Sequence, residues 1–327
     1  MATAGLARCR PLPYAGVEAD KQIKNPAAKR GRRETGKGMI PKLKRSVLAM
    51  PGSNARALEK GKSLGADVLM FELEDGVAEN AKATAREQVV AALKGGGYGE
   101  RQVVVRVNPR ASEWYRDDLA ALASAPPDAI VIPKVDGRDD VLRVSDDLAA
   151  AGMPSSVRLW AMIETPRAIF DVEKIAGAAL SAPRLETLML GPNDIAKSTR
   201  VRLTRGRPGL LAWLSAAVLA ARVHGLDIID GIYNDFNDEA GLRAEAEQGR
   251  DLGMDGKMLI HPAQIGPVNE IFAPSPAEVD FAKKILAAFD LPENRDRGVV
   301  QIEGRMVERL HLDGARRVLA LVGQPSA

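Results

Sequence analysis

Cysteine and histidine are scarce in this sequence. Cys9 is the only cysteine among 327 residues, which excludes an intramolecular disulfide framework and favours a reducing compartment. We therefore expect a cytoplasmic protein, or one of the mitochondrial matrix if the source is eukaryotic. With three histidines and no CxxC or HExxH motif, the sequence lacks the ligand patterns of zinc sites. No apolar run is long and charge-free enough to span a bilayer, so we expect no membrane partner.

Positive charge is concentrated at the start of the chain. Residues 1–38 hold nine Lys or Arg against three acidic residues, a net charge of +6, whereas the whole chain is only +3. The remainder therefore carries −3, and its bulk charge does not support nucleic-acid binding. The first 38 residues lack hydrophobic periodicity, which predicts a disordered leader without a catalytic role. An organelle transit peptide, or a true translation start at Met39, is an alternative.

Eight apolar runs of strand length follow one another from Arg45 onward. They are apolar throughout rather than alternating, which suits a parallel sheet covered on its outer side. Helical patterns lie between them, and eight such repeats in roughly 230 residues predict an α/β protein with a (β/α)₈ barrel. A doubly wound open sheet is the alternative, disfavoured by the count of eight and by the lack of GxGxxG after the first run. The expected strands are residues 45–50, 67–73, 102–107, 129–134, 158–163, 187–191, 227–232 and 257–261.

The chain after the eighth strand pattern predicts further helices. We expect helices at 265–272 and 276–289, the second preceded by a cap-like PSP, and a final helix within 303–323. This divides the chain into the leader, a catalytic barrel over residues 39–290 and a C-terminal lid or extension over 291–327. The last segment is too short for an independent domain. It would cover the barrel mouth or pack on a neighbouring subunit.

Two acidic residues stand directly after predicted strands. Glu164 lies in WAMIETPRAI and Asp194 in TLMLGPNDIA, and each is followed by a helical pattern. Because the carboxyl ends of barrel strands meet at one face, the two carboxylates converge. Such a pair suits Mg²⁺, which takes one or two carboxylates and keeps several waters. The alternative is a pair of ordinary solvated surface charges, as most acidic residues are.

An arginine lies inside an apolar strand pattern. Arg106 in VVVRVN is costly to bury unless it is paired or faces a site. One interpretation is a structural salt bridge with Glu74 or Asp75, and the other is a fixed cation beside the metal. No serine stands in a nucleophile-elbow context, and Lys134 and Lys257 are the only candidates for a Schiff base. The carboxylate pair therefore favours metal-assisted chemistry.

Several motifs, in order, resemble the citrate lyase β-subunit and malyl-CoA lyase family within the HpcH/HpaI aldolase superfamily. The resemblance runs from Arg45 to about Leu321. WYRDDL and GRMVE are more similar to the malyl-CoA or citramalyl-CoA lyase branch. The other matching pieces are RSVLAMPGS, ELEDGVAENAKATAR, VVVRVNP, IPKV, MIETPRAI, LGPNDIA, DGIYNDFNDEAGL, LGMDGKMLIHPAQI and FAPSPAEVDFAKKILAA.

The resemblance implies a Mg²⁺-dependent barrel that makes or cleaves the carbon–carbon bond of a β-hydroxyacyl thioester, such as malyl-, citramalyl- or citryl-CoA. Glu164 and Asp194 would be the metal ligands, and Glu164 and Arg106 would also contact the substrate. Glu308 in GRMVE would be the acid or base, where the family usually has Asp, often donated by a neighbouring subunit. The resemblance also implies a homo-oligomer, a trimer or hexamer.

Further substrate contacts are implied on other loops. Lys60 and the loop from Met50 to Asn54 would bind the phosphates and pantetheine arm of CoA, and Asp230 with Ile229 would line the acyl-thioester site. Asn54 stands where some relatives have a CoA-contacting arginine.

Asn193, a further expected substrate contact, departs from the lyases and is similar to HpaI-type enzymes. Two alternatives therefore stand beside the CoA-ester lyase: an HpaI-like class II aldolase on free hydroxy-keto acids, and a citryl-carrier-protein lyase subunit. A non-enzymatic barrel is disfavoured because so many charged residues end the predicted strands.

Overall fold

The computed structural model describes residues 42–322. The leader predicted for residues 1–38 lies outside the described residues. Within residues 42–322, every helix is too short or too polar to cross a membrane.

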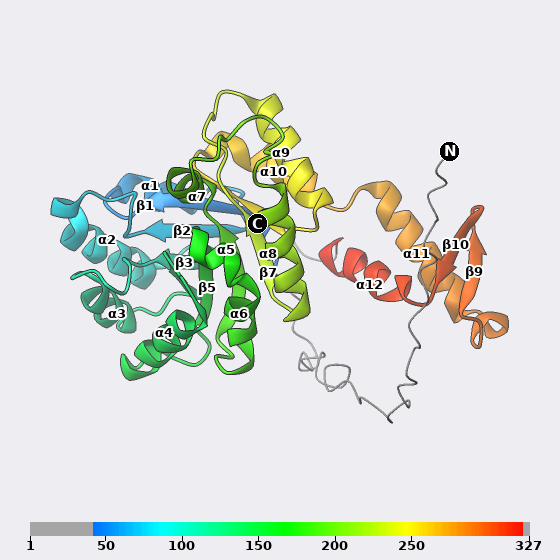
Figure 1. Cartoon of the computed structure of the whole chain (residues 1–327), viewed down its shortest axis with the longest axis horizontal. Coiled ribbons are helices and arrows are strands. Elements are labelled where there is room, and N and C mark those ends of the chain that lie inside the picture. The colour runs from blue at the N-terminus through cyan, green and yellow to red at the C-terminus, as the bar shows by residue number, and fades with distance from the viewer. Residues whose placement is uncertain (1–41, 323–327) are drawn as a thin grey trace, which may run out of the picture. The chain divides into compact units, whose positions relative to one another are not determined.

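The chain forms a closed barrel of eight parallel strands (Figure 1). Each strand pairs with the next in sequence, and β1 closes the barrel by pairing with β8. The predicted (β/α)₈ fold is confirmed, and each of the eight predicted runs overlaps a strand. The strands are β1 (Ser46–Pro51), β2 (Val68–Glu72), β3 (Gln102–Arg106), β4 (Ala129–Ile132), β5 (Arg158–Ile163), β6 (Leu185–Leu190), β7 (Asp227–Asp230) and β8 (Gly256–Leu259).

Helices follow the strands along the chain, several with a side chain that caps the first turn. Asn54, Thr165 and Asp238 each accept a hydrogen bond from a backbone N–H of the helix they precede. The helical pattern expected after TLMLGPNDIA forms a short helix that starts within GPND, with proline at the first helical position. The helices are α1 (Ala55–Gly61), α2 (Lys82–Gly95), α3 (Tyr115–Ala123), α4 (Arg138–Ala150), α5 (Pro166–Phe170), α6 (Val172–Gly177), α7 (Pro192–Thr199), α8 (Leu211–Val223), α9 (Glu239–Asp251) and α10 (Ile265–Phe272).

Side chains on the barrel strands divide between two cores. One set fills the barrel interior, and Val47, Trp160, Met162 and Ile229 belong to it. The alternate residues on the strands face the helices and join the larger core around the barrel. Since both faces are covered, the strands are apolar throughout, as the sequence pattern predicts. The interior is a packed core, so chemistry is confined to the rim.

A small core follows α10. Helix α11 (Pro276–Asp290), strands β9 (Val299–Ile302) and β10 (Arg305–Glu308), and helix α12 (His311–Val322) contribute its buried side chains. The hairpin of β9 and β10 is not foreseen in the sequence analysis. Its turn is Glu303-Gly304, with φ of 49° and 79°. Positive φ at both turn residues is typical of the tight turn that joins antiparallel strands.

Candidate active site

Charged side chains end four successive strands on the carboxyl side of the barrel. Glu72 ends β2, Arg106 ends β3, Lys134 follows β4 and Glu164 follows β5. The register of β2 and β3 places Glu72 directly beside Arg106. Barrel enzymes carry their catalytic groups at this face. These residues and Asp194 after β6 therefore form the candidate active site.

Arg106 is held between two buried carboxylates. Its Nε and Nη2 atoms lie 2.8 and 2.6 Å from Oε2 of Glu72, and Nη1 lies 3.2 Å from Oε2 of Glu74. Burial opposes the charge of the guanidinium, but the two carboxylates outweigh it and the pKa of Arg106 is raised. Arg106 is thus a permanent cation of fixed orientation. The salt bridge expected with Glu74 exists, and Glu72 is a second partner that the sequence analysis did not identify.

Lys134 connects two parts of this site. Its backbone N–H donates to Oε1 of Glu164 at 2.7 Å. Its ammonium nitrogen lies 2.5 Å from Oε1 of Glu74, the same carboxylate that pairs with Arg106. Lys134 therefore contacts both Glu164, the predicted metal ligand, and Glu74, the carboxylate that pairs with Arg106.

Glu164 is buried, with 2 % of its surface exposed. Burial raises the pKa of its carboxyl to about 7, aided by the charges of Glu74 and Asp194 and opposed by the N–H of Lys134 and by Arg106. Its side chain lies against Gly191: a Cβ at that position would come within 2.6 Å of Oε2. A glycine is therefore needed where β6 passes the carboxylate.

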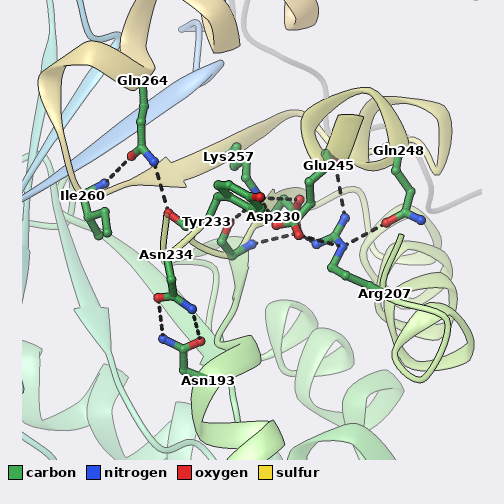
Figure 2. A network of polar contacts seen from close by, with 11 residues as sticks. Asn193, Arg207, Asp230, Tyr233, Asn234, Glu245, Gln248, Lys257, Ile260 and Gln264 are labelled. Atoms are coloured by element: carbon green, nitrogen blue, oxygen red, sulfur yellow. Dashed lines mark hydrogen bonds and ion pairs between the residues drawn. The ribbon is translucent and has the colours of Figure 1, made fainter. Parts of the chain in front are cut away.

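Asp194 lies in the first turn of α7, half-buried, and Asn193 beside it is exposed. The side-chain amides of Asn193 and Asn234 exchange two hydrogen bonds of 3.1 and 3.0 Å. This pair ties the start of α7 to the loop after β7 (Figure 2). The first turn of α7, which carries Asp194, thus begins at the tightly packed Gly191 and is tied to the next loop through Asn234.

The donor set at this rim fits a magnesium ion. Across residues 42–322 no cluster of three or more Asp, Glu, His or Cys is spaced to hold a metal, so the chain offers the carboxylate pair of Glu164 and Asp194. That small hard-oxygen set matches Mg²⁺, which keeps several waters when one or two carboxylates bind it. Gly191 leaves room for the side chain of Glu164, and the charge of Asp194 contributes to the raised pKa of that carboxyl.

Asp230 lies in a buried ionic network. It is fully buried, and its two oxygens accept from Nη1 of Arg207 at 2.7 Å and from Nζ of Lys257 at 2.9 Å (Figure 2). Lys257 also contacts Glu245 at 2.7 Å. Burial raises the pKa of Asp230, but the two cations outweigh it and the net shift is downward. Its neighbour Ile229, also fully buried, belongs to the barrel interior.

The residues predicted to bind CoA lie on β1 and on the helix that follows it, α1. Asn54 caps α1 by accepting from the N–H of Ala57, and Lys60 is exposed in the last turn of that helix. Met50 is buried, close to Gly61 on α1. Asn54 and Lys60 are therefore open to a ligand, whereas Met50 supports the helix that carries them.

Glu308 ends β10. It is half-buried, and its backbone N–H donates to Nδ1 of His311 at 2.9 Å. Within the described part of the chain, no hydrogen bond or ion pair joins Glu308 to Arg106, Glu164 or Asp194. Its predicted role as acid or base is therefore not supported by any such contact within the described part of the chain.

The sequence analysis did not predict the structural roles of three residues at this rim. Glu72 and Arg207 are not named there, and Lys134 is named only as a candidate Schiff base. The cross-strand position of Glu72 beside Arg106 follows once the register is known. The pairing of Arg207 with Asp230 joins residues 23 positions apart and has no local signal.

A (β/α)₈ barrel with buried, paired charges on its carboxyl rim has the architecture of an enzyme, and the comparisons narrow the class. The profile of the HpcH/HpaI aldolase/citrate lyase family matches residues 45–262, so the chain belongs to that family. It is 47% identical over 276 residues to "(3S)-malyl-CoA thioesterase" of Cereibacter sphaeroides, covering 84% of this chain and 93% of the relative. It is 36% identical over 284 residues to "Citrate lyase subunit beta" of Escherichia coli, covering 85% and 93%.

Further relatives agree with this family. "L-malyl-CoA/beta-methylmalyl-CoA lyase" of Cereibacter sphaeroides is 37% identical over 290 residues, covering 81% of this chain and 90% of the relative. The solved structure of CitE from Mycobacterium tuberculosis in complex with magnesium, acetoacetate and coenzyme A superimposes with a TM-score of 0.70 at 27% identity. It covers 86% of this chain and 99% of that chain. The family predicted from the motifs is confirmed, and the chain is an enzyme of the lyase type.

Proposed function

We propose that this protein is a Mg²⁺-dependent carbon–carbon lyase. It cleaves, or in reverse forms, a β-hydroxyacyl-CoA such as malyl-, citramalyl- or citryl-CoA, yielding an acyl-CoA and a 2-keto acid. One observation carries the proposal: the buried carboxylate Glu164 lies at the rim, bound to the N–H of Lys134, whose ammonium pairs with the same Glu74 carboxylate that pairs with Arg106. The complex of CitE with magnesium, acetoacetate and coenzyme A supports the choice of metal and thioester.

Glu164 and Asp194 would hold the metal. When bound, Mg²⁺ supplies a Lewis acid and a template for the carboxylate and hydroxyl of the substrate's 2-hydroxy acid part. The N–H of Lys134 keeps one oxygen of Glu164 in place, so the carboxylate does not need to reorganise as the metal enters.

Arg106 would stabilise negative charge on the enolate or keto-acid oxygen as the carbon–carbon bond breaks. Its guanidinium is already fixed by Glu72 and Glu74, which removes the reorganisation that a mobile cation would require. Glu308 would protonate the enolate carbon. Because no hydrogen bond or ion pair in the described chain joins Glu308 to Arg106, Glu164 or Asp194, we assign it to the active site of a neighbouring subunit.

The thioester arm would extend along α1. Asn54 and Lys60 are the polar groups there, and an exposed ammonium at the end of a short helix is suited to the phosphates of CoA. Asn193 and the loop around Asp230 and Ile229 would face the acyl end.

Thioester hydrolysis is a second candidate. It is favoured by the 47% identity to a protein named (3S)-malyl-CoA thioesterase. The two reactions give different products from malyl-CoA. Cleavage of the carbon–carbon bond releases glyoxylate and leaves the thioester in acetyl-CoA, whereas hydrolysis releases malate and a free thiol.

One assay separates the two. The purified full chain is incubated with malyl-CoA and Mg²⁺, while glyoxylate is followed as its phenylhydrazone and the thiol by a disulfide reagent. Citramalyl-CoA, citryl-CoA and a free 4-hydroxy-2-oxo acid complete the panel. We expect keto acid without equivalent thiol; equimolar thiol and malate without glyoxylate would identify hydrolysis instead.

A homo-oligomer is part of the proposal. Helix α8 is apolar on its outer side as well as its buried side: Leu219 and Val223 are 67% and 72% exposed, and Phe170 on the neighbouring α5 is 89% exposed. An all-round apolar helix is normally buried. We expect a trimer or hexamer by light scattering, and a smaller mass for Leu219→Glu combined with Val223→Glu. A wild-type monomer would contradict this.

A further inference from the structure

Lys134 has a backbone conformation that lysine seldom adopts. Its φ is 53°, in the left-handed region that favours glycine. Such a conformation costs free energy, and residues that keep it cluster at functional sites where the surrounding structure enforces it. The position of Lys134 at the carboxyl end of β4 places this strain on the catalytic rim.

The conformation allows one residue to contact two sides of the site. The N–H of Lys134 points toward β5 and donates to Oε1 of Glu164 at 2.7 Å. Its side chain points toward β2, where Nζ lies 2.5 Å from Oε1 of Glu74 and 3.5 Å from Oδ1 of Asp75. With an ordinary φ, the side chain and the N–H would not have this mutual orientation.

The ammonium continues a chain of alternating charges. Glu74 receives Lys134 on Oε1 and Arg106 on Oε2, and Arg106 is bound in turn to Glu72. The side chains of Glu72 and Glu74 are each only 3% exposed, so their charges depend on these partners. Of these four side chains, that of Lys134 is the most exposed, at 40%, and it stands at the solvent end of the series of charges.

We propose that Lys134 is a positioning residue for both halves of the active site. Its peptide N–H fixes the orientation of Glu164, and its ammonium fixes Glu74 and, through it, Arg106. The inference rests on the proposed function, because it assigns Glu164 to metal binding and Arg106 to the substrate. An ordinary exposed salt bridge would be the competing explanation, but it would require neither the left-handed backbone nor the bond to Glu164.

Four substitutions separate the two roles. Lys134→Gly and Lys134→Val both remove the ammonium, but glycine accepts the left-handed φ and valine does not. Lys134→Met removes the charge with a similar stem, and Lys134→Arg retains a cation. Arg200, with φ of 64° at the exposed end of α7, supplies the matched control Arg200→Gly.

The first readout is Mg²⁺ binding by calorimetry on the full chain without substrate. We expect the dissociation constant to be at least tenfold weaker in Lys134→Val than in Lys134→Gly, which should stay within about threefold of wild type. If thermal denaturation shows that the valine variant does not fold, Lys134→Ala gives the same comparison in milder form. Equal Mg²⁺ affinity in the glycine and valine (or alanine) variants would overturn the backbone role.

The second readout is turnover with malyl-CoA at saturating Mg²⁺. We expect kcat to fall at least tenfold in Lys134→Met with unchanged Mg²⁺ affinity, and Lys134→Arg to recover part of it. Arg200→Gly should leave both unchanged. Full kcat in Lys134→Met would overturn the ammonium role.

Measurements on the wild-type protein distinguish a failure of the proposed lyase reaction from a failure of the role assigned to Lys134. A wild type that binds Mg²⁺ but turns over none of the panel thioesters would reject the proposed lyase reaction, while the glycine–valine comparison would still decide the backbone role. A wild type that binds no Mg²⁺ would reject the metal site and the role of Lys134 together.

Discussion

Gly191 lies against the side chain of Glu164 so closely that any larger residue would displace it. A Cβ at position 191 would stand 2.4 Å from Cβ and 2.6 Å from Oε2 of Glu164. Gly191 directly follows β6 and precedes α7, the helix that carries Asp194, so this glycine lies in the chain between the two predicted metal ligands. The packing of the barrel and the geometry of the site are joined at this contact.

Gly191→Ala should disable the metal site more than the fold. The added methyl group must push Glu164 aside, and such overpacking typically costs about 1–3 kcal/mol. We expect Mg²⁺ affinity, measured by calorimetry, to fall at least tenfold. The control is Gly266→Ala in α10, where a Cβ would meet nothing within 4 Å. Unaltered Mg²⁺ affinity in Gly191→Ala would show that Glu164 does not bind the ion.

The affinity for Mg²⁺ should depend on pH through Glu164. Since burial raises the pKa of this carboxyl to about 7, its charged form, which binds metal, is lost as pH falls below that value. One proton is then released per ion bound, so the dissociation constant should rise about tenfold per pH unit below 7. Calorimetry between pH 5.5 and 8.5, in buffers of different ionisation enthalpy, measures both quantities. A flat profile would contradict the buried-ligand assignment.

The same shift predicts the sign of a stability change in metal-free protein. The folded pKa of Glu164 lies above its unfolded value, so its contribution is fully present below about pH 4.5 and is lost as pH rises through 7. The shift corresponds to about 3 kcal/mol. We measure the free energy of unfolding by urea between pH 4 and 8 in chelator-treated wild type and Glu164→Gln. The variant should lose this pH dependence, and the same pH dependence in both proteins would refute the shift.

Glu308→Gln should slow turnover without weakening metal binding. A positioned acid contributes about 10²–10⁴-fold in rate, and the amide cannot donate the proton. Glu303→Gln, in the turn of the same hairpin, is the control and should remain active. Because Glu308 is assigned to a neighbouring subunit, mixed oligomers of Glu308→Gln and Glu164→Gln should regain activity. Full activity of Glu308→Gln alone would remove it from the mechanism.

Asp230→Asn should destabilise the barrel. The substitution leaves Arg207 and Lys257 buried with one partner fewer, and breaking a buried ion pair costs about 3–5 kcal/mol. Asp147→Asn breaks the exposed pair with Arg110 and should cost no more than about 1 kcal/mol. Urea unfolding measures both. Equal stabilities would show that the network around Asp230 is energetically unimportant.

The fold was predictable because its signals are local. Each strand of the barrel lies in a mainly apolar run, and the cap predicted at PSP is formed by Ser275. The helical pattern expected after TLMLGPNDIA is present as α7, with Pro192 at its first position. The β9–β10 hairpin was not predicted, because its turn Glu303-Gly304 lies between two four-residue strands that are too short to give a clear pattern.

The site was predictable only as far as strand ends could be placed. Glu164 and Asp194 follow β5 and β6, as the sequence indicated. The contacts around these strand ends come from distant parts of the chain. Lys134 donates its N–H to Glu164 from a left-handed backbone conformation that the sequence does not signal, and Arg207 pairs with Asp230, 23 residues away. Such relationships depend on the closed barrel and have no counterpart in a linear pattern.

The most direct test of the central claim is the release of 2-keto acid from malyl-CoA as a function of Mg²⁺ in wild type, Glu164→Gln and Asp194→Asn. Wild type should release keto acid only with Mg²⁺ and stop when the ion is chelated. Either substitution should reduce the rate at least a hundredfold at any Mg²⁺ concentration, since we assign the binding of the ion to this pair. Keto-acid release that persists in chelator, or in both variants, would contradict a metal-dependent lyase centred on Glu164 and Asp194.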